Sequence, residues 1–175
     1  MKKVYCAGHF EFAYKDYSLE NLAKDYRAIL LRDPNKMAHE KKGKPVVFEQ
    51  NQDVEYIGPF YFYEDQKTAF DIVSSEMGKV EEADVLFFYI PNDARCPGTV
   101  TEIVYGATLN KKMVICYEKQ SNTGEPENEI DSPVWYPLLF ASIKNKDNIE
   151  LMQVSNKEEA INYFNNYLLF FELNQ

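Results

Sequence analysis

Strand-like and helix-like stretches alternate along most of the chain. Short runs rich in β-branched and aromatic residues are typical of strands, whereas apolar residues that recur every three or four positions are typical of helices. The expected strands cover residues 3–7, 45–48, 84–90, 112–117 and 148–154. The expected helices cover residues 19–31, 66–82, 99–110, 133–143 and 157–171. A long loop is expected over residues 51–64.

The run from Val85 to Ile90 is apolar at every position. A strand without alternation is covered on both faces, which is typical of a parallel sheet between helix layers. Together with the alternation of strands and helices, this run predicts an α/β fold: a doubly wound, Rossmann- or flavodoxin-like sheet of five parallel strands with helices on both faces. Such sheets bind ligands outside the carboxyl ends of their strands. We expect residues 1–175 to form one domain.

The overall composition narrows the class of protein. The chain has 175 residues, of which 45% are hydrophobic and 27% charged, a content typical of a globular domain. Nineteen basic against 28 acidic residues leave a net charge of −9, which opposes binding to a nucleic-acid polymer or an anionic membrane. No apolar run approaches the roughly 20 residues needed to cross a bilayer. The first residues predict a strand and not a signal peptide.

Cysteine and histidine are too sparse for an obvious metal centre. The three cysteines form no CxxC pair, and His9 and His39 lie far apart. We therefore expect no metal site, and we expect a reducing, cytoplasmic location. The chain also lacks a GxGxxG or Walker motif, so no dinucleotide or other cofactor is expected.

Glu76 lies in the middle of an apolar helix face. At about 100° per residue, the face of the expected helix 66–82 comprises Ala69, Ile72, Val73, Val80 and Ala83. A carboxylate aimed inward is costly unless it is paired, hydrogen-bonded or facing a cavity. A rotated helix, or a Glu76 at the edge of the layer, is an equally good reading of this pattern.

Glu102 falls in the first turn of the helix expected to follow Gly98. It points away from the apolar stripe of that helix, so we expect it to be free of the core. A helix N-terminus favours the ionised carboxylate, which suits a nucleophile. By itself, an ordinary first-turn glutamate explains the position as well.

Aromatic residues make up 15% of the chain. Tyr5 lies in the carboxyl half of the first expected strand, where it could hydrogen-bond a carboxylate or simply fill the core. Phe60 and Tyr61 begin an aromatic cluster in the loop predicted after the second strand. Such faces stack on nucleobases, although a packing or subunit-interface patch is the commoner explanation.

Taken together, three segments resemble the nucleoside 2-deoxyribosyltransferase family. The matching segments are VYCAGHF (residues 4–10), EMGKVEEADV (76–85) and GTVTEIVYGA (98–107), the last followed by NKK (110–112). The third segment resembles the family's Gly-x-x-x-Glu signature, whose glutamate is the nucleophile. A catalytic Asp stands in the family at the place of Glu76.

The resemblance implies an enzyme that transfers a deoxyribosyl group between bases. Glu102 would attack the anomeric carbon and form a covalent glycosyl-enzyme, Glu76 would handle the proton on the base, and Tyr5 would orient Glu102. This agrees with the two-carboxylate retaining scheme, and burial of Glu76 would keep a proton available for the leaving base. The expected substrate-binding residues are Gly8, His9, Phe10, Phe60, Tyr61, Asp93, Cys96 and Gly98.

The chain departs from the family pattern at two positions. Many members carry an acidic residue where this chain has Cys96, with Asp93 nearby, and Glu76 is one methylene longer than the family's Asp. A nucleoside 5′-monophosphate N-glycosidase and a non-catalytic nucleotide-binding domain therefore remain alternatives. The expected partners are a small nucleoside or nucleotide, a free nucleobase and, since the family shares its sites between subunits, a second copy of the chain.

Overall fold

The computed structural model describes residues 2–8, 54–59, 68–92, 97–119, 132 and 134–173. One sheet of five strands organises this part of the chain. Its strands are β1 (Lys2–Gly8), β2 (Val54–Gly58), β3 (Val85–Ile90), β4 (Lys112–Glu118) and β5 (Ile149–Val154). The strands are all parallel and lie in the order β2-β1-β3-β4-β5. This is the flavodoxin-like doubly wound order, so the predicted fold class is confirmed.

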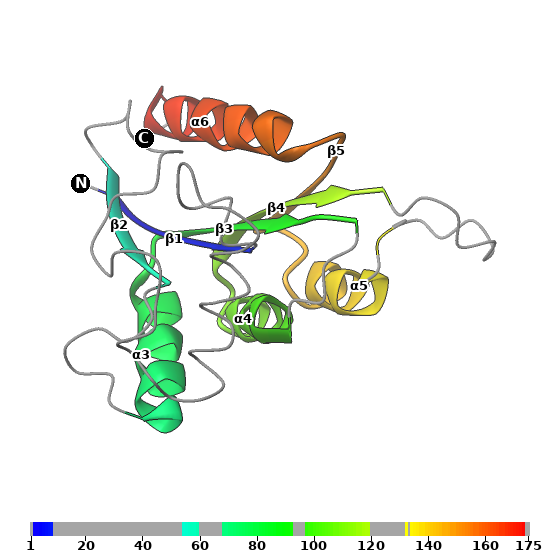
Figure 1. Cartoon of the computed structure of the whole chain (residues 1–175). Helices are drawn as coiled ribbons and strands as arrows, with labels where there is room; N and C mark the ends of the chain where they lie inside the picture. The colour runs from blue at the N-terminus through cyan, green and yellow to red at the C-terminus, as the bar shows by residue number, and fades with distance from the viewer. Residues whose placement is uncertain are drawn as a thin grey trace, which may run out of the picture.

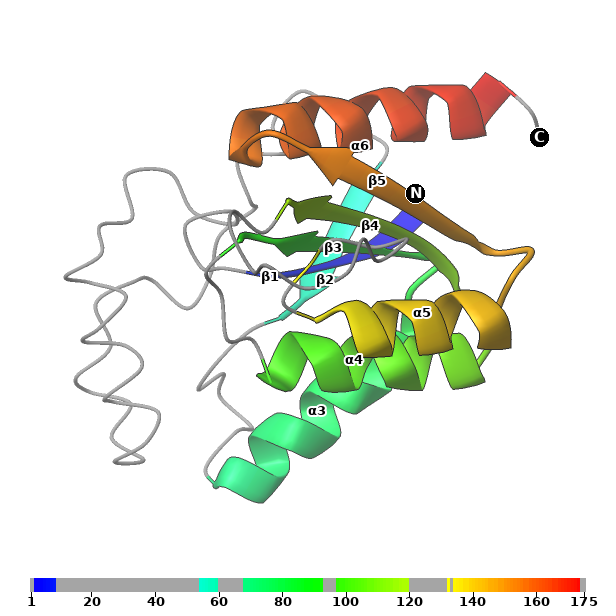
Figure 2. The ribbon, with the colours of Figure 1, turned by 90° about the vertical axis from the view of Figure 1, so that its right-hand side faces the viewer.

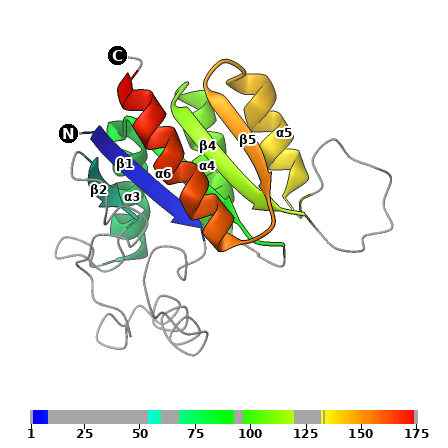
Figure 3. The same ribbon diagram turned by 90° about the horizontal axis from the view of Figure 1, so that it is seen from above.

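Helices cover both faces of the sheet. The described helices are α3 (Ala69–Glu82), α4 (Pro97–Thr108), α5 (Trp135–Lys144) and α6 (Lys157–Leu173). Figure 1 shows α6 on one face and α3, α4 and α5 on the other, and Figure 2 shows the same layers from the side. Seen from above, α6 runs across the sheet between β1 and β4 (Figure 3).

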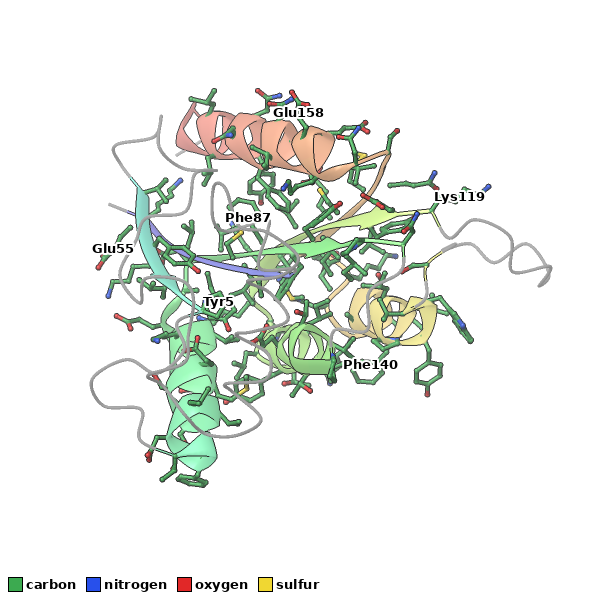
Figure 4. All side chains as sticks on the ribbon, viewed as in Figure 1. Tyr5, Glu55, Phe87, Lys119, Phe140 and Glu158 are labelled. Carbon is green, nitrogen blue, oxygen red and sulfur yellow. The ribbon has the colours of Figure 1, made fainter. Side chains whose placement is uncertain are left out.

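Side chains alternate between two core clusters, as the pleat of a strand requires. On β1, Tyr5 and Ala7 belong to the cluster under α3, α4 and α5, whereas Val4 and Cys6 belong to the cluster under α6. Figure 4 shows the same division, with Tyr5 on the side of α3 and α4 and Phe87 on the side of α6. Tyr5 therefore faces the helix layer that carries both candidate carboxylates.

Most expected elements match the observed ones to within a few residues. The expected strand 45–48 and helix 19–31 lie outside the described residues. The expected loop 51–64 is wrong at residues 54–58, which form β2. Its Gly58–Pro59 pair is typical of a turn, yet the segment pairs with β1 and thereby completes the sheet edge.

Gly106 allows α4 to approach the sheet closely. A Cβ atom at this position would lie 2.5 Å from Leu86 Cδ1 and 3.3 Å from the sulfur of Met113. The first of these contacts is shorter than packed atoms allow, so a larger side chain would force Leu86 to shift or α4 to move away from the sheet. Glu102 lies one turn earlier on the same helix, where its side chain meets Tyr5 of β1.

Candidate active site

A buried hydrogen bond joins the first strand to α4. The hydroxyl group of Tyr5 donates to Glu102 Oε1 at 2.7 Å. Tyr5 is fully buried and Glu102 is 6% exposed. The structure thus brings together the two side chains whose contact the family resemblance implies, although they lie 97 positions apart.

The prediction that Glu102 is free of the core is wrong. α4 begins at Pro97, two residues earlier than expected, so Glu102 lies in its second turn and no acidic residue lies in its first. The buried face of α4 also includes Thr99, Ile103 and Gly106. It is wider than the apolar stripe suggests because α4 packs against α3 as well as against the sheet.

Burial changes the protonation of Glu102. Loss of solvent is the largest effect and raises the pKa of Glu102 to about 7. The hydrogen bond from Tyr5 lowers that pKa, and the nearby charge of Glu76 raises it. The expectation of a readily ionised first-turn glutamate is therefore corrected: Glu102 is poised between its two forms near neutral pH.

Glu76 points into the protein from the middle of α3, as its position on the helix predicts. It is 3% exposed and shares the buried face with Ile72, Val80 and Ala83. Val73, expected on the same face, is 59% exposed and that expectation is wrong. The prediction that Glu76 points into the protein is confirmed. The alternative, a helix rotated so that Glu76 faces outward, is excluded.

Lys79 forms an ion pair with Glu76, a contact that the sequence analysis missed. Its Nζ atom donates to Glu76 Oε1 at 2.9 Å, and its side chain is only 19% exposed. The two residues are three positions apart on one helix, the spacing at which side chains on a helix meet. That spacing was a usable signal once Glu76 had been singled out.

The carboxyl end of β2 forms a wall of the same site. The register of β1 and β2 shifts between Val4 and Tyr5, so that Gly58 lies beside Tyr5. A Cβ atom at Gly58 would lie 2.9 Å from Tyr5 Cε2, 2.9 Å from Lys79 Cδ and 3.1 Å from Glu76 Oε2. Only a glycine fits here without displacing these side chains, and irregular pairing of this kind is common near functional sites.

Two predicted substrate-binding glycines are described by the structure. Gly8 ends β1 with a φ of 146°, and a Cβ atom there would lie 2.4 Å from the carbonyl oxygen of Tyr89. Gly98 lies exposed in the first turn of α4. The other predicted substrate-binding residues lie outside the described residues: His9, Phe10, Phe60, Tyr61, Asp93 and Cys96.

The site therefore combines two buried carboxyl groups, a phenol and an ammonium group on three elements of the fold. Carboxyl groups in different environments can divide the work of nucleophile and proton donor. Among the residues that the structure describes, no three His, Cys, Asp or Glu side chains are grouped so as to hold a metal ion. No helix in the described ranges is long and apolar enough to span a membrane.

The fold and the site define a doubly wound α/β protein with a buried carboxyl pair. No protein-family model and no curated protein matches the chain. Among solved structures, the chain is similar to the Clostridium botulinum CMP N-glycosidase BcmB, with a TM-score of 0.52 and 14% identity over 95% of this chain and 99% of that chain. A weaker match is Aquifex aeolicus Era bound to GDP and AlF4−, with a TM-score of 0.43 and 16% identity over 97% of this chain and 56% of that chain. At this level of identity, the first match supports the fold.

Proposed function

We propose that the chain is an enzyme that cleaves the N-glycosidic bond of a nucleoside or nucleotide and transfers the sugar to another base. The observation that carries the proposal is the buried contact between Tyr5 and Glu102, with Glu76 near enough to influence the charge of Glu102. A fold with a purely binding role has no need of two carboxyl groups held out of water, where each costs stability.

In this proposal Glu102 is the nucleophile. One of its carboxylate oxygens forms a bond to the anomeric carbon as the bond between that carbon and the base nitrogen breaks, and the electron pair of that bond stays on the base. Glu76 gives the proton that the base takes up. The hydrogen bond from Tyr5 orients Glu102 and favours its charged form, the form that can attack.

The covalent intermediate would then react with an acceptor. A second nucleobase gives a new nucleoside, which is transfer, and water gives free sugar or sugar phosphate, which is hydrolysis. The similarity of fold to a CMP N-glycosidase favours hydrolysis of a nucleoside 5′-monophosphate as the second candidate function. Both share the first half of the reaction and the same three side chains.

Chromatography of reaction mixtures tests the proposal. The purified protein is incubated with nucleosides and nucleoside 5′-monophosphates, with and without a second free base. A new nucleoside that forms only with the added base supports transfer, and free base without exchange supports hydrolysis. If the wild type releases no base from any of them, glycosidic cleavage is contradicted and the binding-domain alternative gains support.

We also propose that the protein forms at least a homodimer. On α5, Tyr136, Phe140 and Ile143 follow each other at helical spacing and are 67%, 39% and 75% exposed. Figure 4 shows Phe140 on the side of α5 that faces away from the sheet. An apolar stripe of this kind is typical of an interaction surface. A monomeric mass by light scattering at all concentrations would contradict this proposal.

A further inference from the structure

The ion pair between Lys79 and Glu76 is part of the wall of the candidate site. Only 19% of the Lys79 side chain and 4% of the Glu76 side chain are exposed. Gly58 lies beside both of them, since a Cβ atom at this position would lie 2.9 Å from Lys79 Cδ and 3.1 Å from Glu76 Oε2. The pair is thus held between α3 and β2, on the same side of the sheet as Tyr5 and Glu102.

A buried carboxylate beside an ammonium group is a poor proton donor by itself. An opposite charge at hydrogen-bond distance favours the ionised form of a carboxyl group. The structure places such a charge 2.9 Å from Glu76 Oε1. The leaving base nevertheless needs a proton, and the ammonium group of Lys79 carries three.

We propose that Lys79 is a positioning residue of this site that supplies, through the Glu76 carboxylate, the proton taken up by the leaving base. The inference rests on the proposed function. As the bond between sugar and base breaks, the Glu76 carboxylate accepts a proton from Lys79 Nζ and passes it to the base nitrogen. Glu76 ends as the carboxylate it began as, Lys79 ends as a neutral amine, and water then protonates Lys79 again. No oxidant or further reactant is required.

Substrates with different leaving groups separate this relay from a merely structural role. A natural base must be protonated as it leaves, whereas para-nitrophenolate leaves as a stable anion. The relay therefore predicts that Lys79→Met slows cleavage of a nucleoside by roughly 100-fold, the lower end of what proton transfer contributes, because Glu76 would become a buried carboxylate without the Lys79 charge on giving up its proton. The same variant should cleave a para-nitrophenyl deoxyriboside, with or without a 5′-phosphate, at nearly the wild-type rate. The loss should be in kcat and not in KM.

Three further variants complete the test. Lys79→Arg keeps a positive charge and several donors at the same place, but a guanidinium group does not release its proton, so it should keep the fold and lose the natural reaction. Glu76→Gln should show the same selectivity between substrates as Lys79→Met. The double variant Glu76→Gln with Lys79→Met removes both charges of the ion pair, so that neither charge is left buried without the other. It should be no slower than either single variant, because the two residues act as a unit. If Lys79→Met alone fails to fold, the double variant can be used in its place to compare the two kinds of substrate.

Lys3→Met is the matched control. Lys3 pairs with Glu82 at the end of the same helix, but both side chains are well exposed, at 38% and 53%. This variant should cleave both substrates at the wild-type rate.

Two results would overturn the relay alone. One is a Lys79→Met variant as fast as the wild type on nucleosides, and the other is an equal loss on nucleoside and nitrophenyl substrates. A wild type that cleaves neither kind of substrate overturns the proposed function and the relay with it.

Discussion

Each kind of polar contact in the candidate site has a counterpart nearer the surface on the same three elements, β1, α3 and α4. The buried Tyr5–Glu102 hydrogen bond corresponds to a hydrogen bond from Tyr105 to Glu81, and the buried ion pair Lys79–Glu76 corresponds to Lys3–Glu82. The residue types are the same. What differs is burial: Glu102 and Glu76 are 6% and 3% exposed, whereas Glu81 and Glu82 face solvent.

Burial, more than the pairing itself, determines how readily these carboxyl groups ionise. At the surface, water screens each charge and such pairs add little to stability. In the site, loss of water raises the pKa of Glu102 to about 7, even though Tyr5 pulls it down. A group near this pKa can change its charge during a reaction at neutral pH. The surface pairs therefore provide a control for each residue of the site.

Replacing the buried glutamate should have the largest effect. Glu102→Gln keeps the shape of the side chain and removes the nucleophile, so we expect base release to fall by roughly 1,000-fold or more. Glu81→Gln, its surface counterpart, should leave the rate unchanged. Base release followed by chromatography measures both. Equal rates for the two variants would show that the buried carboxyl group has no part in the chemistry.

The stability of the protein should depend on pH through Glu102. Its pKa rises from 4.5 to about 7 on folding, so between these pH values the folded chain holds a proton that the unfolded chain has lost. The free energy of unfolding should therefore fall as the pH rises from about 4.5 to 7, by about 3 kcal/mol for this group. Urea unfolding at several pH values measures the slope. Glu102→Gln should lose this contribution, and an unchanged slope in that variant would contradict the assignment.

Tyr5→Phe removes the hydrogen bond but keeps the ring. Hydrogen bonds to charged groups contribute about 1.5–3 kcal/mol, so cleavage should slow by roughly 10- to 100-fold. The pKa of Glu102 should rise further, because the hydrogen bond from Tyr5 lowers it, and the acid limb of the rate profile should move to higher pH. Tyr105→Phe should do neither. A Tyr5→Phe profile that overlies that of Tyr105→Phe would remove Tyr5 from the mechanism.

A methyl group added at the site should cost more than one added outside it. In Gly58→Ala the new carbon would lie 2.9 Å from Tyr5 Cε2 and from Lys79 Cδ, so we expect a loss of about 1–3 kcal/mol in unfolding free energy. In Gly78→Ala no atom of the described residues lies within 4 Å of the new carbon, and a helical alanine should add about 0.5–1 kcal/mol. Thermal unfolding measures both variants. Equal changes in Tm would mean that a side chain at Gly58 does not clash with Tyr5 and Lys79.

Periodicity and buried strand runs were enough to predict the sheet and most of its helices. The apolar run from Val85 to Ile90 predicted a strand covered on both faces, and β3 is buried at every position. The edge strand β2 was missed because its pairing with β1 depends on a partner about 50 positions away, which no local pattern contains. Edge strands and irregular registers are fixed by tertiary contacts.

From the pattern of residues alone, the sequence could identify a site residue only where a polar side chain interrupts an apolar helix face. Glu76 was such a residue, and it lies where the pattern placed it. Glu102 was identified by the family resemblance. The pattern of apolar residues along α4 predicted that Glu102 would lie outside the core, but Glu102 is buried. That pattern does not show that α3 also packs against α4. Gly58 could not be found from the sequence, because its role depends on three side chains from two other elements of the fold.

The most direct test of the central claim is the mass of the protein during turnover. A reaction with substrate is quenched in acid after a few milliseconds to seconds, and the protein is digested and weighed by mass spectrometry. We expect a sugar or sugar-phosphate adduct on the peptide that contains Glu102, present in the wild type and absent from Glu102→Gln. Free base that accumulates without any adduct on that peptide, at every quench time and also in Tyr5→Phe, would contradict the covalent role of Glu102.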